Sequence, residues 1–584
     1  MEDISTMGYL KKYINIYKKQ YIIALIFLTI EAICDLMQPT IMSKIIDKGV
    51  SAKNMSYVLH MGAIMLMITA LGAVSAVVRN IVSSNVSQKF GSQLRGDLFR
   101  KIQRFSFNSI DKFQGASLIT RLTNDVTQVQ NFAHGMMRIF VKAPILCIGS
   151  LVMASLINPP MAIILLVIVP VIAGIIYMNM RVGYPFFVKM QRALDKVNSV
   201  MREYLAGVRV VKAFNRFSHE VNRFEEVNNE LAGVSINGMR AMAIFNPAIA
   251  LTVNIGIVLV LWFGGVKVNN GTMQVGQIIA FTNYMTQILF SLVMMSHVFS
   301  MFIRAKASAE RIGEVFEIEN KHEEIKSPDE LDEISGRVDF ENVTFSYAGA
   351  SEPVLKNISF TCKTGETLAV IGSTGSGKSS LVNLIPRFYD ATEGSVKIDG
   401  VDVKRIDLKK LRESIAVVPQ KTTLFTGTIL ENIRWGNENA TLEEVENWAK
   451  VSQAHEFILS FPEGYNTVLG QGGVNLSGGQ KQRISIARAL IKRPKILILD
   501  DSTSAVDVDT EGKIRRELKK HLGDTTCILI AQRITSVMGA DRILVLDDGS
   551  IAGIGTHEDL MNECEIYKDI YRSQIGEEGT SNEF

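Results

Sequence analysis

Six long apolar stretches in the first 305 residues set the strongest limit on what this chain can fold into. A helix needs about 20 apolar residues to cross the hydrocarbon core of a bilayer, and every stretch is close to that length. The mean hydropathy of +0.18 also excludes a disordered chain. We therefore predict a membrane domain of six helices, at Tyr21–Met42, Val58–Val78, Val141–Ile157, Met161–Met180, Ile244–Gly264 and Ile278–Val298.

The distribution of positive charge predicts how these helices are oriented. Lys and Arg gather before the first span, after the second and after the fourth, whereas the turn Asn158–Pro160 between the third and fourth spans carries none. Because cytosolic loops are enriched in Lys and Arg, both termini should be cytosolic. The first loop, with Lys44, Lys48 and Lys53, is a mild exception. The whole chain has 62 basic and 59 acidic residues, so its charge gives no sign of nucleic-acid binding.

Two long cytosolic segments, roughly 79–140 and 181–243, place apolar residues at helical spacing with almost no Pro or Gly. Each segment is interrupted once near its middle. We predict that membrane helices extend far into the cytosol and return through short crossing helices, at Phe107–Asp111 and Gly207–Phe217. Both elements mix apolar and charged residues, a composition suited to docking on another domain. An ordinary surface turn is the alternative at each.

The sequence pattern changes after the sixth span, which closes a membrane domain of residues 1–319 with its two coupling segments. A polar linker covers 320–336. Short β-branched and aromatic runs then alternate with helices over 337–575, which is typical of a parallel α/β domain. Residues 576–584 form a loose tail.

A phosphate-binding loop follows one predicted strand of the α/β domain. Thr367–Ile371 has the composition of a buried strand, and Gly372–Ser379 fits G-x-x-x-x-G-K-[ST] in full. In such a loop, backbone N–H groups and the start of the next helix surround the phosphates. The lysine reaches the β/γ-phosphates and the final hydroxyl binds Mg²⁺. The predicted contacts are Gly372, Ser373, Thr374, Gly375, Ser376, Gly377, Lys378, Ser379 and Ser380.

A second strand and a second glycine-rich segment complete the pattern. Lys495–Leu499 is an apolar strand that ends in Asp500, and an acid there can hold Mg²⁺. Before it, Leu476, Ser477, Gly478, Gly479 and Gln480 precede a helix, whose N-terminus can bind an anion. This pentapeptide and the order of the motifs resemble those of the ABC (ATP-binding cassette) ATPases. With its six spans, the chain over about 10–575 resembles bacterial multidrug-type exporters.

The resemblance implies an all-α six-helix transmembrane domain with long cytosolic helical extensions, fused to an α/β P-loop nucleotide-binding domain that uses ATP and Mg²⁺. It implies that Tyr347 stacks on adenine and that Gln420 contacts the γ-phosphate and Mg²⁺. It also implies that each ATP site forms between two cassettes. Leu476–Gln480 would then bind the nucleotide of a second half-transporter chain.

Two positions depart from the family pattern. The family usually has Glu as general base after the Mg²⁺ aspartate, whereas this chain has the shorter Asp501. A misplacement of about 1 Å can cost about 10²-fold in rate. The family also has a switch His where this chain has Gln532, which cannot become cationic. Our hypothesis is a slow, ATP-retaining site on this chain and a competent site on a different partner chain. The alternative is that Asp501 and Gln532 still work adequately.

The sequence says less about the cargo. Glu31 and Asp35 lie on one face of the first span, and acids within a span indicate a substrate pathway or a basic partner. They could attract cationic lipophiles, or pair with a basic residue of this chain or of its partner. The predicted function is export of lipophilic substrates or drugs through the cell membrane by a heterodimer in the lipid bilayer. The alternative is an ATP-gated channel or a regulatory membrane ATPase.

Overall fold

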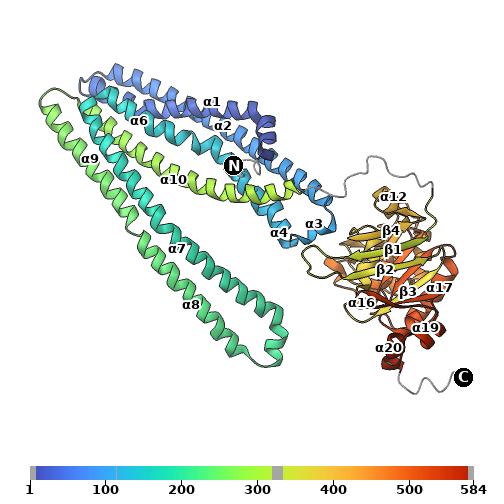
Figure 1. Cartoon of the computed structure of the whole chain (residues 1–584). Helices are drawn as coiled ribbons and strands as arrows, with labels where there is room; N and C mark the ends of the chain where they lie inside the picture. The colour runs from blue at the N-terminus through green and yellow to red at the C-terminus, as the bar shows by residue number, and fades with distance from the viewer. Residues whose placement is uncertain (1–7, 114, 319–332, 576–584) are drawn as a thin grey trace. The chain divides into compact units, whose positions relative to one another are not determined.

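The computed structural model describes residues 8–113, 115–318 and 333–575. These residues form two compact units, shown in Figure 1. The first, here the helical unit, comprises Met1–Gln103 and Gln114–Glu319, and the second, here the α/β unit, comprises Arg104–Phe113 and Asn320–Phe584. Most of the predicted linker 320–336 and the whole predicted tail 576–584 lie outside the described residues.

The helical unit confirms the predicted six-helix architecture. Within the described residues, six helical stretches are long and apolar enough to cross a membrane: Gly8–Val50, Met55–Gln103, Gly115–Ile157, Pro159–Ala213, Phe217–Asn269 and Val275–Glu317. Their α-helices are α1 (Gly8–Lys44), α2 (Met55–Gln103), α4 (Gly115–Thr120), α5 (Val126–Gly135), α6 (Lys142–Ile157), α7 (Pro159–Ala213), α8 (Phe217–Met242), α9 (Phe245–Asn269) and α10 (Val275–Glu317). Three short π-helical segments, at Ile45–Val50, Arg121–Asp125 and Met136–Phe140, join neighbouring helices.

The two predicted crossing elements differ. The first is α3 (Phe107–Asp111), whose N-terminus is capped by the Ser106 side chain. At the second, all residues from 207 to 217 are described and none forms a separate helix, because α7 continues through Gly207 to Ala213. The positive φ of 50° at Asn215 then ends α7, and α8 begins at Phe217. Figure 1 shows α7 and α8 as a long hairpin.

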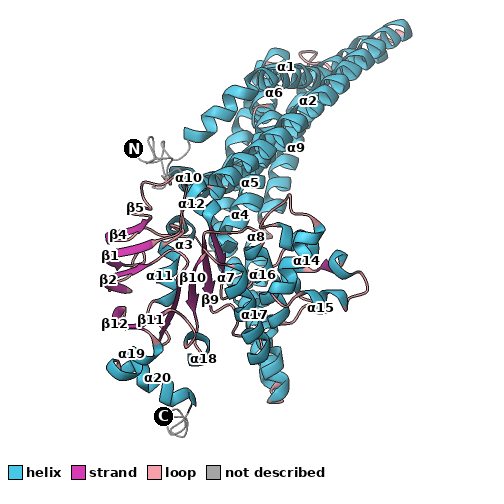
Figure 2. Ribbon diagram, turned by 90° about the vertical axis from the view of Figure 1, so that its right-hand side faces the viewer, coloured by secondary structure: helices cyan, strands magenta, loops and turns pink. Residues whose placement is uncertain are grey.

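The α/β unit is built on a six-stranded sheet of order β12-β11-β3-β10-β9-β6, in which only the edge strand β12 is antiparallel. Figure 2 labels four strands of this sheet, β9, β10, β11 and β12. The strands are β3 (Thr367–Gly372), β6 (Ile415–Val418), β9 (Ile496–Asp500), β10 (Thr526–Ile530), β11 (Arg542–Asp547) and β12 (Ser550–Gly555). The helices are α3, α11 (Lys378–Leu384), α12 (Leu408–Ser414), α13 (Ile429–Arg434), α14 (Leu442–Val451), α15 (His455–Leu459), α16 (Gly478–Leu490), α17 (Val508–His521), α18 (Ile534–Val537), α19 (His557–Glu563) and α20 (Glu565–Ile575).

Alternate residues of the central strands face two different cores. In β9, Ile496 and Ile498 belong to one buried cluster, whereas Leu497 and Leu499 belong to the other. Side chains alternate between the faces of a strand, so a strand that is apolar at every position must be covered on both faces. The continuous apolar run in the sequence therefore explains why helices pack on both sides of this sheet.

The prediction of a parallel α/β domain was incomplete, because the unit also holds antiparallel pairs. A four-stranded sheet has the order β2-β1-β4-β5, and β7 pairs with β8. These strands are β1 (Val338–Phe345), β2 (Leu355–Cys362), β4 (Glu393–Ile398), β5 (Val401–Asp402), β7 (Gly427–Thr428) and β8 (Val468–Leu469). Phe340 and Phe360 stack across β1 and β2 with ring centroids 4.6 Å apart.

Candidate functional site

The site forms where four parallel strands end at one edge of the sheet. Ile530 of β10 pairs with Val370 of β3 and with Asp500 of β9, and Val418 of β6 pairs with Leu499. The residues that follow these four strand ends are therefore neighbours. They are the phosphate loop after β3, Gln420 after β6, Asp501 after β9 and Gln532 after β10.

The phosphate loop has the close backbone approaches that require glycine. A Cβ at Gly372 would lie 2.0 Å from the carbonyl oxygen of Leu546. Gly377 has a φ of 95°, and its Cβ would lie 2.9 Å from the carbonyl oxygen of Val354. Lys378 folds back over the loop, and its Nζ donates to the carbonyl oxygens of Gly372 (3.0 Å) and Ser373 (2.7 Å). The ammonium group thus lies inside the concave face of the loop.

Two side-chain oxygen atoms beside this loop could act as ligands of a hard divalent cation. Ser379 Oγ donates to Asp500 Oδ1 over 3.0 Å. Burial raises the pKa of Asp500, and the nearby Asp501 carboxylate raises it further. Burial lowers the pKa of Lys378. A bound cation would stabilise the charged form of this buried carboxylate. Mg²⁺ is commonly held by one or two protein oxygens together with phosphates. Ser379 and Asp500 therefore fit the predicted ion.

Three predicted site residues meet at a single oxygen atom. Asp501 Oδ2 accepts hydrogen bonds from Gln532 Nε2 at 2.8 Å and from Gln420 Nε2 at 3.1 Å. Asp501 is only 7% exposed. Its backbone is left-handed, with a φ of 46°, a conformation that Asp tolerates better than most residues. The base position and the switch position are thus joined directly through Oδ2.

Tyr347 lies next to the phosphate-loop helix, as adenine stacking would require. Its hydroxyl is hydrogen bonded to Ser380 Oγ at 2.9 Å. Its ring contacts that of Tyr389 edge-on at 5.2 Å. Tyr389 in turn contacts the Phe107 ring of α3 at 5.9 Å and donates to Asp111 Oδ2 at 2.8 Å. A continuous set of contacts therefore joins α3 to the candidate adenine position.

The glycine-rich pentapeptide begins α16 and does not line the phosphate loop of its own chain. Ser477 and Gln480 cap the helix reciprocally, with distances of 2.9 and 3.3 Å. A Cβ at Gly479 would lie 2.8 Å from the carbonyl oxygen of Ala505. Within the described part of the chain, no hydrogen bond or ion pair joins Leu476–Gln480 to Gly372–Ser379.

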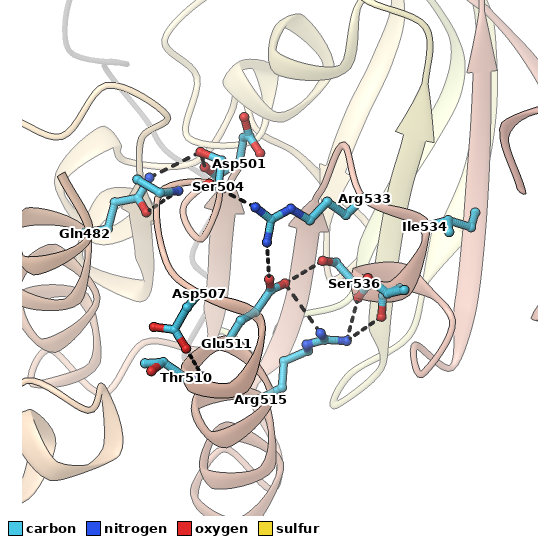
Figure 3. Close-up of polar contacts among 12 residues, drawn as sticks. Gln482, Asp501, Ser504, Asp507, Thr510, Glu511, Arg515, Arg533, Ile534 and Ser536 are labelled. Carbon is cyan, nitrogen blue, oxygen red and sulfur yellow. Dashed lines mark hydrogen bonds and ion pairs between the residues drawn. The ribbon is translucent and has the colours of Figure 1, made fainter. Parts of the chain in front are cut away.

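Sequence reasoning missed Gln482, which links this helix to the base position (Figure 3). Its side chain donates to Ser504 Oγ at 3.4 Å and accepts from the backbone N–H of Ala505 at 3.1 Å. Ser504 Oγ donates to the carbonyl oxygen of Asp501 at 3.0 Å. A polar residue on the buried side of a helix was the available signal, since Gln482 is 5% exposed.

The membrane acids Glu31 and Asp35 have basic partners on this chain. Lys142 Nζ lies 2.6 Å from Glu31 Oε1 and 2.9 Å from Asp35 Oδ2. Arg79 Nε donates to Glu31 Oε2 at 2.6 Å. The cluster joins α1, α2 and α6, and its two acids and two bases have no net charge. Arg79 directly follows the predicted second span and Lys142 is the second residue of the predicted third span, but sequence spacing did not pair them with Glu31.

Comparison with known proteins gives the same architecture for the whole chain. Residues 21–292 match the family "ABC transporter transmembrane region" and residues 355–504 match "ABC transporter". The uncharacterized ABC transporter ATP-binding protein YfiB of Bacillus subtilis (strain 168) is 43% identical over 560 residues, which are 96% of this chain and 97% of that protein. YgaD of the same bacterium, named provisionally as a multidrug export ATP-binding/permease protein, is 33% identical over 97% of this chain and its own full length. The solved structure of a bacterial Atm1-family ABC exporter with ATP bound has a TM-score of 0.79 and 25% identity, over 96% of this chain and 98% of the other.

Proposed function

This chain belongs to the ABC transporter family, as a half-transporter of exporter type, and we propose that it works with a different partner chain and retains ATP at its own site. The family and fold imply a multi-pass membrane protein with an ATPase domain that drives transport. In this proposal the two nucleotide sites of the transporter differ, because one retains ATP and the other hydrolyses it.

The observation that carries the proposal is the bonding of Asp501. A general base must reach the proton that it removes. The carboxylate of Asp501 is one methylene closer to the backbone than a glutamate, and one of its oxygens is already shared by the amides of Gln420 and Gln532. Both amides are neutral at every accessible pH. These features favour holding ATP over cleaving it.

The intact pentapeptide supports a second, competent site. Leu476–Gln480 has the full family sequence, and the reciprocal cap leaves the first turn of α16 ordered. A helix N-terminus with free backbone N–H groups suits a phosphate group. We propose that it serves the ATP bound to the partner chain, which would supply its own glutamate and histidine.

The contacts support the following roles for the individual residues at this chain's own site. Lys378 would turn from the loop carbonyls to the β/γ-phosphates, and Tyr347 would stack on adenine. Ser379, Asp500 and Gln420 would hold Mg²⁺, which supplies neutralising charge between the phosphates when bound. Asp501 and Gln532 keep a water molecule poorly aligned, so bond cleavage is slow.

Two surfaces support coupling to the membrane helices. Within the α/β unit, α3 packs its Phe107 ring against Phe388 at 4.7 Å, and Asp111 accepts from Tyr389. At the end of the α7–α8 hairpin, Phe214 and Phe217 are 74% and 65% exposed. Exposed aromatic rings of this kind are suited to burial against another protein. We propose that the hairpin docks on the cassette of the partner chain, with both cassettes on the cytosolic side.

The cargo class is proposed to be small and lipophilic. The pairing of Glu31 and Asp35 with Arg79 and Lys142 reduces their pull on a free cation, so a strongly cationic cargo has less support than a neutral or weakly polar one. Acids and bases inside a membrane domain usually face a pathway or the interior of the bundle. We therefore propose that this cluster of two acids and two bases lines the substrate pathway.

The test compares this chain purified alone with the same chain purified with its partner, in lipid nanodiscs. The proposal predicts that the lone chain binds ATP but hydrolyses it at least about tenfold more slowly than the pair. Comparable turnover by the lone chain would overturn the proposal. Vesicle transport assays then separate a pump from a channel, because only a pump moves its cargo against a gradient.

A further inference from the structure

The turn that carries the switch residue Gln532 is held by a side chain from the last helix of the α/β unit. Gln574 Oε1 accepts from the backbone N–H of Ile534 at 2.7 Å. Gln574 Nε2 donates to the carbonyl oxygen of Gln532 at 2.8 Å. One amide thus bonds the backbone on both sides of Arg533, as a neighbouring strand would. This fixes where the backbone of Gln532 lies.

The helix that presents Gln574 is itself firmly packed. Tyr567 is fully buried and Tyr571 is 6% exposed, and both belong to a main core cluster of the unit. The Tyr567 hydroxyl is hydrogen bonded to His557 Nδ1 at 2.7 Å. Gln574 therefore acts from a stable support, although it follows the nucleotide motifs by a long stretch of sequence.

The other side of the turn is held by a buried acid, as Figure 3 shows. Glu511 of α17 is 3% exposed, accepts from Ser536 Oγ at 2.5 Å and lies 3.6 Å from Arg533 Nη1. Arg533 Nη2 donates to the carbonyl oxygen of Ser504 at 3.4 Å. Arg533 thus bridges Glu511 and the loop that follows Asp501. A buried charge is costly unless it is paired. Breaking the contacts of Glu511 would therefore be unfavourable, and this favours a fixed position for Arg533.

We propose that Gln574 and Glu511 are positioning residues for Gln532: together they fix the turn that holds its amide against Asp501. Within the described residues, neither side chain is hydrogen bonded to the phosphate loop or to Asp501. Each acts through the backbone or through Arg533, and the distance between Gln532 Nε2 and Asp501 Oδ2 depends on both. The base and switch positions are therefore set by α17 and α20 as well as by the strands that carry them.

A double-mutant cycle between Gln574 and Gln532 tests this inference. The full-length chain in nanodiscs, in excess over γ-labelled ATP, is followed in single-turnover reactions as wild type, Gln574→Met, Gln532→Ala and the double variant. The methionine keeps the size of Gln574 but removes both hydrogen bonds. We expect Gln574→Met to raise the single-turnover rate about threefold to tenfold, because it loosens the Gln532 amide from Asp501, with little change in the affinity for ATP. The same change should have almost no effect once Gln532 is alanine. The dwell time of bound ATP gives the same cycle where cleavage is too slow to follow.

One further variant controls for general damage, and another tests Glu511. Ser573→Ala, on the neighbouring residue whose hydroxyl donates only to the carbonyl oxygen of Ile570, should leave all rates unchanged. Glu511→Gln should show the same dependence on Gln532, and Gln574→Met carries the test alone if that buried variant does not fold. Effects of Gln574→Met that persist in full without the Gln532 side chain, or its failure to alter either rate or dwell time, would overturn the inference. The effect of Gln574→Met is measured once with Gln532 present and once with alanine at position 532. The comparison of these two effects does not depend on whether the wild-type site is slow.

Discussion

The two glycine-rich motifs of this chain differ in how well the residues around them suit catalysis. At the strand ends, the phosphate loop is complete, but the base and switch positions hold Asp501 and Gln532. At α16, Leu476–Gln480 keeps the whole family pentapeptide, and its cap and close glycine contacts are in place. In our proposal, one chain therefore combines a site that binds ATP with a motif that completes another site.

The residues at one motif can therefore depart from the family pattern while the other motif stays intact. The strand-end cluster and α16 are joined through Gln482 and Ser504, so movement at one can reach the other. Changes that damage α16 should therefore stop the partner's site, whereas changes at the strand ends should alter retention of ATP by this chain. The following variants separate these outcomes.

The largest loss is expected from Gly479→Ala. Its new Cβ would lie 2.8 Å from the carbonyl oxygen of Ala505, so α16 or the loop must move. A displacement approaching 1 Å predicts a fall in the ATP turnover of the paired transporter of about 10²-fold. Gly512→Ala, at a glycine with open space around it, is the matched control and should be close to wild type. Equal turnover of the two variants would show that α16 plays no part in the competent site.

The largest gain is expected from Asp501→Glu combined with Gln532→His. The longer carboxylate and the ionisable ring restore the family's base and switch, and general-base assistance is worth about 10²-fold or more. We expect about a tenfold rise in hydrolysis at this chain's site, because φ of 46° at residue 501 is less favourable for Glu than for Asp. Single-turnover rates measure the gain. Asp501→Asn with Gln532→His is the control, and an unchanged rate in the glutamate variant would place the defect elsewhere.

Lys378→Ala should weaken retention of ATP much more than turnover of the pair. The variant removes the ammonium that folds over the phosphate loop, so bound ATP should dissociate rapidly from this chain. Turnover of the pair should fall only about threefold, since the competent site uses the partner's phosphate loop and this chain's α16. A collapse of turnover to background would mean that hydrolysis takes place at Lys378 itself.

The smallest effect is expected from Tyr389→Phe, which sharpens the link between α3 and the nucleotide site. The change removes the hydrogen bond to Asp111 and keeps the ring contacts with Phe107 and Tyr347. Because the ring contacts remain, we take the low end of what one such bond contributes, about 0.5 kcal/mol. Transport per ATP hydrolysed should then fall about twofold while ATP binding is unchanged. Tyr571→Phe, on the buried side of α20, is the control. A normal ratio of transport to hydrolysis would exclude this contact from coupling.

The sequence predicted the strand-end cluster well because its motifs are local and parallel strands align their ends. An apolar run followed by a glycine-rich loop, an Asp or a Gln identifies the end of each strand, and the sheet brings those ends together. The two-faced core of β9 was likewise implied by its unbroken apolar run. The four-stranded antiparallel sheet was missed, because β1 pairs with both β2 and β4, and the sequence gives no sign of which strands pair.

Features that depend on contacts between distant segments could not be predicted. Arg79 and Lys142 pair with Glu31 only because α1, α2 and α6 pack together. The second crossing helix was wrong because residues 207–213 hold no helix breaker strong enough to end α7. Gln574 gave no signal at all, since a glutamine near the end of a surface helix is ordinary until the turn beside it is seen.

The central claim is that this chain holds ATP uncleaved, and photolabelling tests it most directly. The paired transporter is incubated with γ-labelled photoreactive azido-ATP and Mg²⁺ during turnover, freed of unbound nucleotide, irradiated and separated into its two chains. The account predicts that γ-label stays on this chain and is lost from its partner. Loss of γ-label from this chain at the rate seen on the partner would contradict it.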